Sequence, residues 1–129
     1  MIAWTSTPPE GASKGLLMAA LVARFLVAAF FVFLAIKNLS GDEQMASDFR
    51  RWGYSDGFRV FTAGVQIVGA VLLVWLPLSF FGAALLAGLL MGAIWTHVRH
   101  DPVATVTQPV MVLVPIVLFL LFYRPVALR

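Results

Sequence analysis

The sequence predicts an all-α integral membrane protein, a four-helix bundle with a short amphipathic surface helix between its first and second spans. Three observations support this class. Hydrophobic residues make up 61% of the 129 residues and charged residues only 12%, against about 45–50% and about 25% in soluble domains. Four apolar runs are long enough to cross a bilayer, for which about 20 helical residues suffice. These runs do not alternate with a period of two, so they do not read as barrel strands.

The composition also excludes several classes of function. So few charged residues leave too little polar surface for an ordinary soluble enzyme or a disordered chain. The net charge of +3 comes from basic residues scattered between apolar runs, so we predict no nucleic-acid partner. Cysteine is absent, which excludes disulfides, thiolate metal ligands and thiol redox chemistry carried by this chain.

The four predicted spans cover residues 16–36, 58–76, 79–96 and 103–122. No charged residue occurs between Arg59 and Arg99, and Pro77 divides this stretch because proline cannot donate a helical hydrogen bond. Residues 1–15 are rich in Ser, Thr, Pro and Gly and are predicted to be a mobile tail. The first span has a cleaved signal peptide as its alternative. Residues 16–129 thus form one domain with both termini on one side of the membrane.

The connection between the first two spans carries its own helix signals. Ser40 and Glu43 match a capping box, and Gly53 marks a helix end. Three apolar side chains recur on one helical face between these signals: Met45, Phe49 and Trp52. We expect a short amphipathic helix that lies either on the membrane surface or across the mouth of the bundle as a lid.

Two polar residues within the spans are candidate ligand-binding residues. A charge inside a span is costly, so Arg24 is expected to face protein or water, beside the small residues Ala20 and Ala28. Arg24 either anchors an anionic or carbonyl-bearing ligand, such as a quinone or a lipid head group, or it extends to the membrane surface or hydrogen-bonds to carbonyls. Gln66 is predicted to lie about as far from the opposite membrane face as Arg24 lies from its own, so the two differ in depth by less than about 10 Å. The long side chain of Arg24 could bridge much of this gap if the two helices face each other. Gln66 either meets a ligand or joins helices by hydrogen bonds.

Further candidates gather at the end of the bundle opposite the termini. These candidate ligand-binding residues are Lys37, His97, His100 and Asp101. The last three lie about one helical turn apart, and two imidazoles with a carboxylate could begin a metal site. A structural zinc site needs a fourth ligand, so we predict no metal and interpret the group as a polar helix end.

Small residues recur every four positions in the third span, at Ala84, Gly88 and Gly92. Such a ridge permits close helix approach, so we predict packing inside the bundle, with a homo-oligomer or a docked partner as alternatives. The sequence contains no phosphate loop, nucleophile triad or paired carboxylates, and no catalytic residue is predicted. More Lys and Arg lie at the end opposite the termini, which favours a cytoplasmic location for that end.

The order of several motifs resembles the DoxX-like family of small four-helix membrane proteins. The motifs are Arg24-Phe25, Ala35-Ile36-Lys37, Phe49-Arg50-Arg51-Trp52-Gly53-Tyr54, Gly64-x-Gln66-x-x-Gly69-Ala70 and Thr96-His97. That family commonly has a glutamate at the position of Gln66. The resemblance implies a prokaryotic cytoplasmic (inner) membrane protein, surrounded by lipid, with quinone-linked redox work among its relatives.

Two functions of different classes follow as hypotheses. The first is an accessory or anchoring subunit of a membrane redox system, with a quinone as its candidate cofactor and a soluble or membrane redox enzyme as its partner. The second is a small transporter or permeation module for an uncharged or anionic solute. In neither is the chain expected to be an enzyme on its own.

Overall fold

The computed structural model describes residues 2–129 of the chain. Within these residues the chain is helical and contains no strand. Its α-helices are α1 (Lys14–Ser40), α2 (Glu43–Arg51), α3 (Asp56–Val74), α4 (Ser79–His100) and α5 (Thr107–Phe122). Short 3-10 turns cover Ile2–Trp4, Leu76–Leu78, Val103–Val106 and Val126–Leu128.

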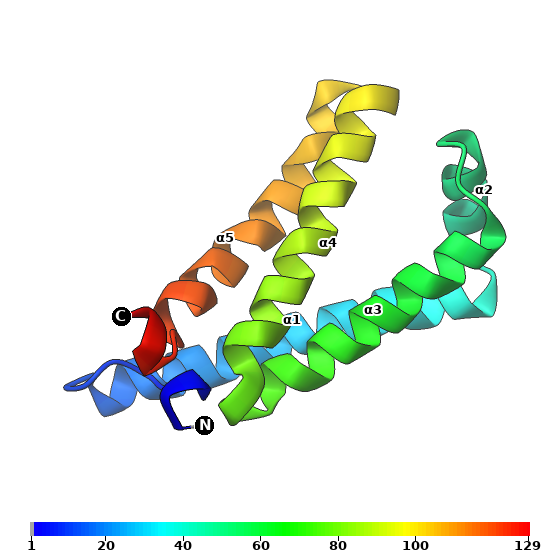
Figure 1. Ribbon diagram of the computed structural model, residues 1–129. Coiled ribbons are helices and arrows are strands. Elements are labelled where there is room, and N and C mark those ends of the chain that lie inside the picture. Colours follow the sequence, from blue (N-terminus) through cyan, green and yellow to red (C-terminus); the bar gives the residue numbers. More distant parts are fainter. Residues whose placement is uncertain (1) are drawn as a thin grey trace.

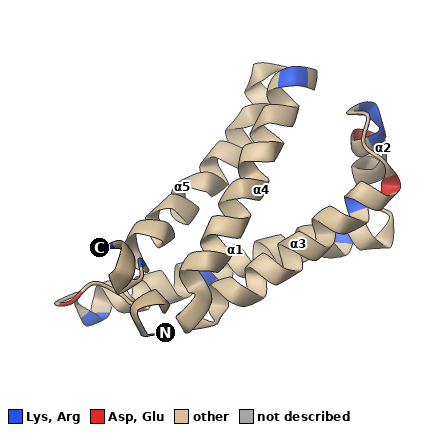
Figure 2. Ribbon diagram, in the orientation of Figure 1, with Lys and Arg blue, Asp and Glu red and all other residues tan. Residues whose placement is uncertain are grey.

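The predicted membrane class is confirmed. Among the described residues, four helical stretches are long and apolar enough to cross a membrane: Lys14–Ser40, Asp56–Val74, Leu76–His100 and Val103–Phe122. Acidic and basic residues concentrate near the helix ends and on α2, while the long middle sections are largely uncharged (Figure 2). Many large apolar side chains of these sections are exposed, as expected where lipid rather than water surrounds a bundle.

The four long helices form two pairs that diverge from a shared end (Figure 1). The helix α1 packs along α3, and α4 packs along α5, while α3 also packs against α4. In contrast, α1 and α5 touch each other little. Both termini lie at the shared end, which we call the closed end, and α2 lies at the opposite, open end (Figure 1).

A single buried stripe runs along each helix of the α1–α3 pair. In α1 the stripe consists of Arg24, Ala28, Phe31, Ala35 and Asn38. These residues are spaced alternately by four and three, which places them on one face of a helix. The matching stripe of α3 consists of Arg59, Thr62, Ala63, Gln66, Gly69, Ala70 and Leu73. Both stripes contain polar residues toward the open end, so this interface is not purely apolar.

Close packing between α3 and α4 depends on two glycines near the closed end. A Cβ atom added to Gly82 would overlap the backbone nitrogen of Leu73 and lie 2.9 Å from the carbonyl oxygen of Gly69. A Cβ atom added to Gly69 would lie 2.5 Å from a methyl carbon of Leu86. Neither position has room for a side chain: Gly82 meets the backbone of α3 directly, and the side chain of Leu86 packs onto Gly69.

The predicted packing ridge of Ala84, Gly88 and Gly92 does not form this internal contact. All three residues are exposed, and a Cβ atom added to Gly88 or Gly92 would meet no atom within 4 Å. The physical reason is the divergence of the helix pairs, because α4 leaves α3 beyond the crossing at Gly82 (Figure 1). The prediction of internal packing at this ridge is therefore corrected, and a homo-oligomer or a docked partner stays a prediction.

The boundary between α1 and α2 differs from the predicted capping box. Ser40 is the last residue of α1, and its hydroxyl donates to the carbonyl of Lys37. Gly41, with φ +74°, ends α1 in the left-handed conformation that glycine adopts without strain. The N-cap of α2 is Asp42, whose carboxylate accepts the N–H of Met45. Because Gly41 intervenes, Ser40 cannot cap α2, and Asp42 takes that role.

The N-terminal tail, predicted to be mobile, folds against the closed end over its described residues. Ser6 is only 3% exposed. Its backbone N–H donates to the carbonyl of Pro77, and its hydroxyl accepts the N–H of Phe80. The side chain of Arg129 donates to the carbonyls of Thr7 and Pro8. These bonds tie both terminal segments to the closed end, so the tail is part of the fold.

Candidate functional site

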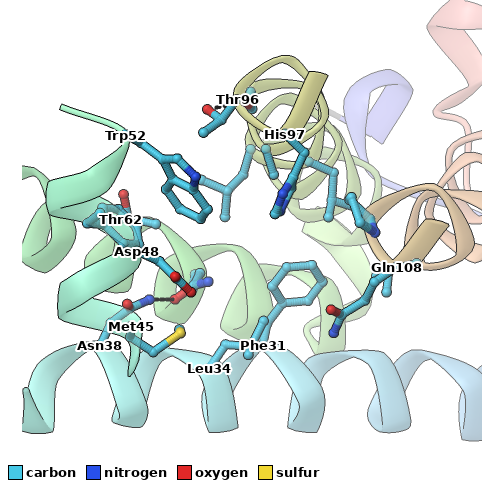
Figure 3. Close-up of a pocket in the computed structure, with 18 of the residues that line it drawn as sticks. Phe31, Leu34, Asn38, Met45, Asp48, Trp52, Thr62, Thr96, His97 and Gln108 are labelled. Carbon is cyan, nitrogen blue, oxygen red and sulfur yellow. Dashed lines mark hydrogen bonds between the residues drawn. The ribbon is translucent and has the colours of Figure 1, made fainter. Parts of the chain in front are cut away.

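A cavity of about 470 Å³ lies between the diverging helix pairs. This volume falls within the roughly 300–1,000 Å³ of small-molecule sites. Side chains from all five α-helices line the cavity, and Figure 3 shows them converging on a common space. Its aromatic lining consists of Phe30, Phe31, Phe49, Trp52, Tyr54 and Phe58. Its polar lining consists of Asn38, Asp48, Thr62, Gln66, Thr96, His97 and Gln108.

The helix α2 covers the cavity at the open end. Its apolar face contributes Met45 and Phe49 to the lining, and the following loop contributes Trp52 and Tyr54. Gly53, between these two aromatic residues, has φ +87°, a left-handed conformation that ends the helix. The predicted surface helix is therefore also a lid, because its apolar face turns onto the cavity.

The lid is joined to the end of α4 by a cluster around Asp101, whose side chain is only 6% exposed. Arg51 forms an ion pair with this carboxylate, Trp52 donates its indole N–H over 3.1 Å, and His97 shares a 2.8 Å hydrogen bond. The hydrogen bond from Arg51 is the main reason that the pKa of Asp101 lies below its usual range. This cluster of Arg51, Trp52, His97 and Asp101, which we call the latch, connects the α1–α3 pair to the α4–α5 pair at the open end.

A second polar contact supports the same closure. The hydroxyls of Tyr54 and Thr96 lie 2.7 Å apart and share a hydrogen bond. Thr96 also donates to the carbonyl of Gly92, one turn earlier in α4. Tyr54 thus bridges from the loop after α2 to a buried position on α4, beside the cavity.

The predicted site residues of the open end occupy different places. His97 lines the cavity, whereas Asp101 lies in the latch. Lys37 and His100 do not line the cavity, and the amine of Lys37 lies 5.6 Å from the ring centre of Phe33. The part of the chain that the structure describes contains no group of three or more His, Cys, Asp or Glu side chains able to hold a metal ion.

Gln66 lines the cavity together with a residue that sequence reasoning missed. The side-chain oxygen of Gln66 accepts a 3.1 Å hydrogen bond from the amide of Asn38. A signal for Asn38 was present, because it continues the buried stripe of α1 by three residues beyond Ala35. Arg59 is a further missed residue, and its guanidinium donates to the backbone carbonyl of Asn38.

Arg24 lies at the closed end and takes no part in the cavity lining. It is 5% exposed and donates a 2.9 Å hydrogen bond to the hydroxyl of Ser79. Ser79 in turn donates to the carbonyl of Leu73, and the guanidinium carbon lies 5.0 Å from the ring centre of Tyr123. The predicted approach of Arg24 to Gln66 is not observed, because the turn between α3 and α4 brings Ser79 to Arg24 instead.

The cavity adjoins a shallower pocket between α1 and α5. The two share the lining residues Phe30, His97, Gln108 and Val112. Because α1 and α5 make few contacts with each other, this side of the cavity is not sealed by helix packing.

Comparison with curated proteins and with solved structures gives no match. Comparison with protein families gives a match to the DoxX-like family over residues 22–119. The matched region contains α2, α3 and α4 entirely and most of α1 and α5. Every residue that lines the cavity falls within it. The chain therefore belongs to the DoxX-like family, as a membrane protein with four helices able to span a bilayer.

Proposed function

We propose that this protein is an accessory subunit of a redox system in a prokaryotic cytoplasmic membrane, and that it binds a quinone-type electron carrier in the cavity. The observation that carries the proposal is the cavity itself, about 470 Å³ in volume and lined from every α-helix. It lies in the open-end half of the helices that are long and apolar enough to span a membrane.

The lining chemistry supports a lipophilic ligand with a polar, uncharged head. Aromatic rings supply much of the wall, and such rings pack well against a flat ring system. No Lys or Arg lines the cavity in the described part of the chain, so an anionic head group would find no counter-charge there. A few convergent amide and hydroxyl groups then fix orientation, which is the usual composition of a small-molecule site.

The state of the titratable side chains favours a binding role over a catalytic one. Asp48 accepts from Gln44 and pairs with Arg51. Tyr54 bonds to Thr96, and His97 bonds to Asp101. Each titratable group of the lining is thus held by another side chain. Electron transfer to or from a bound carrier would then be the work of a partner enzyme.

A cavity-filling variant tests the ligand part of the proposal. Gly92 lines the cavity and has open space around it, so Gly92→Leu should fill the cavity without a backbone clash. The matched control is Gly64→Leu, because Gly64 is also helical, exposed and free of neighbours within 4 Å, but lies outside the lining. Both variants remove a helix glycine, so their helix propensities rise equally.

The measurement is the retained small molecule. Each protein is purified in a mild detergent from membranes that contain quinones, and the extract is quantified by mass spectrometry. We expect the wild type and Gly64→Leu to retain a quinone near one per chain, and Gly92→Leu to retain at least fivefold less. Retention of phospholipid alone by the wild type, or equal quinone in all three proteins, would refute the proposed ligand.

The accessory role is tested separately by the proteins that copurify. We expect a stoichiometric enzyme that carries a redox cofactor and reduces or oxidises the retained quinone. A protein that holds quinone but has no such partner would be a carrier-binding module, and the redox-subunit part of the proposal would fail.

The transporter hypothesis receives less support from the geometry. The packed residues Phe31, Leu73, Leu86, Ile116 and Phe119 belong to the buried core. Arg24, Ser79 and the terminal segments then close the end where the termini lie. The cavity thus reaches one end of the bundle only. Solute uptake into liposomes by the purified protein alone, above protein-free liposomes, would reverse this preference.

A further inference from the structure

His97 has one ring nitrogen that is engaged and one that is free. Its Nδ1 lies 2.8 Å from a carboxylate oxygen of Asp101, in the latch. Its Nε2 makes no hydrogen bond within the described part of the chain. The side chain is 23% exposed, and Nε2 does not belong to the unpartnered atoms that are fully buried, which are Nε of Arg24, Oδ1 of Asn38 and Nε of Arg59. This nitrogen is therefore accessible to a bound molecule.

The free nitrogen is turned toward the cavity. His97 lines both the cavity and the shallower pocket between α1 and α5. In Figure 3 its ring projects from α4 toward Phe31 on the opposite wall. The two nitrogens of an imidazole lie on opposite sides of the ring. Nε2 therefore points into the space between the walls, while Nδ1 contacts Asp101, which does not line the cavity.

The partners of Asp101 decide which ring nitrogen carries the proton. Arg51 and the indole of Trp52 both contact this carboxylate and can only donate. The hydrogen bond from Arg51 is the main reason that the pKa of Asp101 lies below its usual range, so the carboxylate is ionised and can only accept. His97 must then donate from Nδ1. In a neutral imidazole with its proton on Nδ1, Nε2 is an acceptor without a hydrogen.

No donor of the cavity wall serves this acceptor. The hydroxyls of Thr62 and Thr96 donate to carbonyls one turn earlier in their own helices. No Lys or Arg lines the cavity in the described part of the chain. A hydrogen bond to Nε2 therefore needs a donor on a bound molecule.

We infer that Nε2 of His97 accepts a hydrogen bond from the hydroxyl head group of a lipophilic ligand, a phenol or the quinol form of an electron carrier, with Asp101 as its positioning residue. A hydroxyl brings a hydrogen to the lone pair of Nε2. A quinone carbonyl or an ether oxygen brings a second lone pair instead and makes no bond. This inference rests on the proposed function of the cavity. It adds that the site holds the reduced, hydroxyl-bearing carrier more tightly, and that His97 causes this preference.

The first test compares a ligand that can donate with one that cannot. These are 4-octylphenol and its methyl ether, 4-octylanisole, titrated against the full-length protein in lipid nanodiscs by isothermal calorimetry. Affinities are referred to the ligand concentration in the lipid, because the ether partitions into lipid more strongly. We expect the phenol to bind about fivefold more tightly than the ether, the effect of about one hydrogen bond. Equal affinities for the wild type would overturn the inference.

A variant of His97 separates its contact with the latch from its contact with the ligand. In His97→Asn the amide N–H can replace Nδ1 as the donor to Asp101, but the side chain ends before the position of Nε2. We expect the phenol-to-ether ratio of affinities to fall to about one. The control is Thr62→Val, which removes a lining hydroxyl that is already used within α3 and should preserve the ratio. An unchanged ratio in His97→Asn would overturn the inference.

Nitrogen NMR of the histidine rings tests the role of Asp101 directly. The chain has two histidines, and His100→Gln identifies the signals of His97. At about pH 8.5, where an ordinary histidine is neutral, we expect a hydrogen on Nδ1 and none on Nε2. The phenol should shift the Nε2 signal and the ether should not, while Asp101→Leu should mix the two tautomers. A hydrogen on Nε2 in the wild type, or a single unchanged tautomer in Asp101→Leu, would overturn the assignment.

Failure of this inference can be distinguished from failure of the cavity as a ligand site. If Gly92→Leu weakens both ligands while the wild type binds them equally, the cavity is the site and the assignment of His97 is wrong. If neither ligand binds the wild type, or if Gly92→Leu changes neither affinity, the cavity itself is not the site and both proposals fail. The wild-type ratio and the wild-type NMR signals decide the assignment if His97→Asn does not fold.

Discussion

The contact between α3 and α4 should be the most sensitive packing position of the bundle. In the structure, a Cβ atom at Gly82 would lie 2.8 Å from the carbonyl carbon of Leu72 and 2.9 Å from the carbonyl oxygen of Gly69, whereas ordinary contacts begin at 3.4 Å. The neighbours are backbone atoms, so they cannot rotate away as a side chain would. Gly82→Ala therefore requires the helices to separate by roughly 0.5–1 Å in an interior packed at crystal-like density.

The expected free-energy change follows from two opposing effects. Overpacking a well-packed contact costs about 1–3 kcal/mol. Replacing a helical glycine by alanine returns about 0.5–1 kcal/mol. We expect Gly82→Ala to lower the free energy of unfolding by about 1–2 kcal/mol. The matched control is Gly88→Ala, which meets no atom within 4 Å and should leave stability unchanged or raise it by up to about 1 kcal/mol.

The assay is reversible unfolding in mixed micelles, with increasing SDS, followed by far-ultraviolet circular dichroism. A loss of stability in Gly88→Ala equal to or larger than that in Gly82→Ala would refute this reasoning. That result would mean that α4 packs through the ridge of Ala84, Gly88 and Gly92 after all. A neutral Gly82→Ala would mean that α3 and α4 are farther apart than the structure shows.

Three further predictions concern the two ends of the bundle. Ser79→Ala leaves Arg24 buried without its hydroxyl partner, so the same SDS titration should show a loss of about 1–3 kcal/mol; no loss would mean that water replaces the hydroxyl. Because the pKa of Asp101 is lowered, the latch should persist above the usual carboxyl pKa of about 3.9 and open as the pH falls below it. The tryptophan fluorescence of the wild type should therefore stay constant from pH 8 to about 4. The fluorescence of Asp101→Asn should differ from that of the wild type over this whole range. An opening of the latch near pH 6 in the wild type would contradict this prediction. Asp42→Ala should cost about 1 kcal/mol through its lost N-cap, while Ser40→Ala should change stability by less than about 0.5 kcal/mol; the reverse order in the unfolding assay would restore the predicted capping box.

Much of the architecture could be predicted because the membrane imposes strong constraints on sequence. A span needs about 20 apolar residues in a helix, so the four spans could be placed from hydropathy and from Pro77. The charge of Arg24 left two positions open, inside the bundle or extended to the membrane surface, and in the structure its side chain is buried. The apolar face formed by Met45 and Phe49 of α2 and by Trp52 just after it was evident from spacing, and these residues line the cavity. Each of these features depends on a local pattern.

The contacts between helices could not be predicted, because they depend on the angles at which the helices cross. Small residues occur at Gly69, Gly82, Gly88 and Gly92, and nothing in their spacing says which of them meets another helix. The partner of Arg24 is Ser79, 55 positions away in sequence, and only the turn after α3 brings them together. Spacing likewise identified the apolar face of α2 but not what that face covers.

The divergence of the helix pairs connects these observations into one account of the cavity. Contact at Gly82 holds α3 against α4 near the closed end, and the two helices separate toward the open end. Such a wedge loses dispersion contacts unless side chains or a lipophilic molecule occupy it. The lid supplies Phe49 and Trp52 from above, yet Gly88 and Gly92 present no side chain to the same space. Leucine at either glycine would occupy part of it and remain helical. The two glycines, whose spacing had predicted packing, therefore leave this space open, which is why Gly92→Leu is the variant that tests the proposed function.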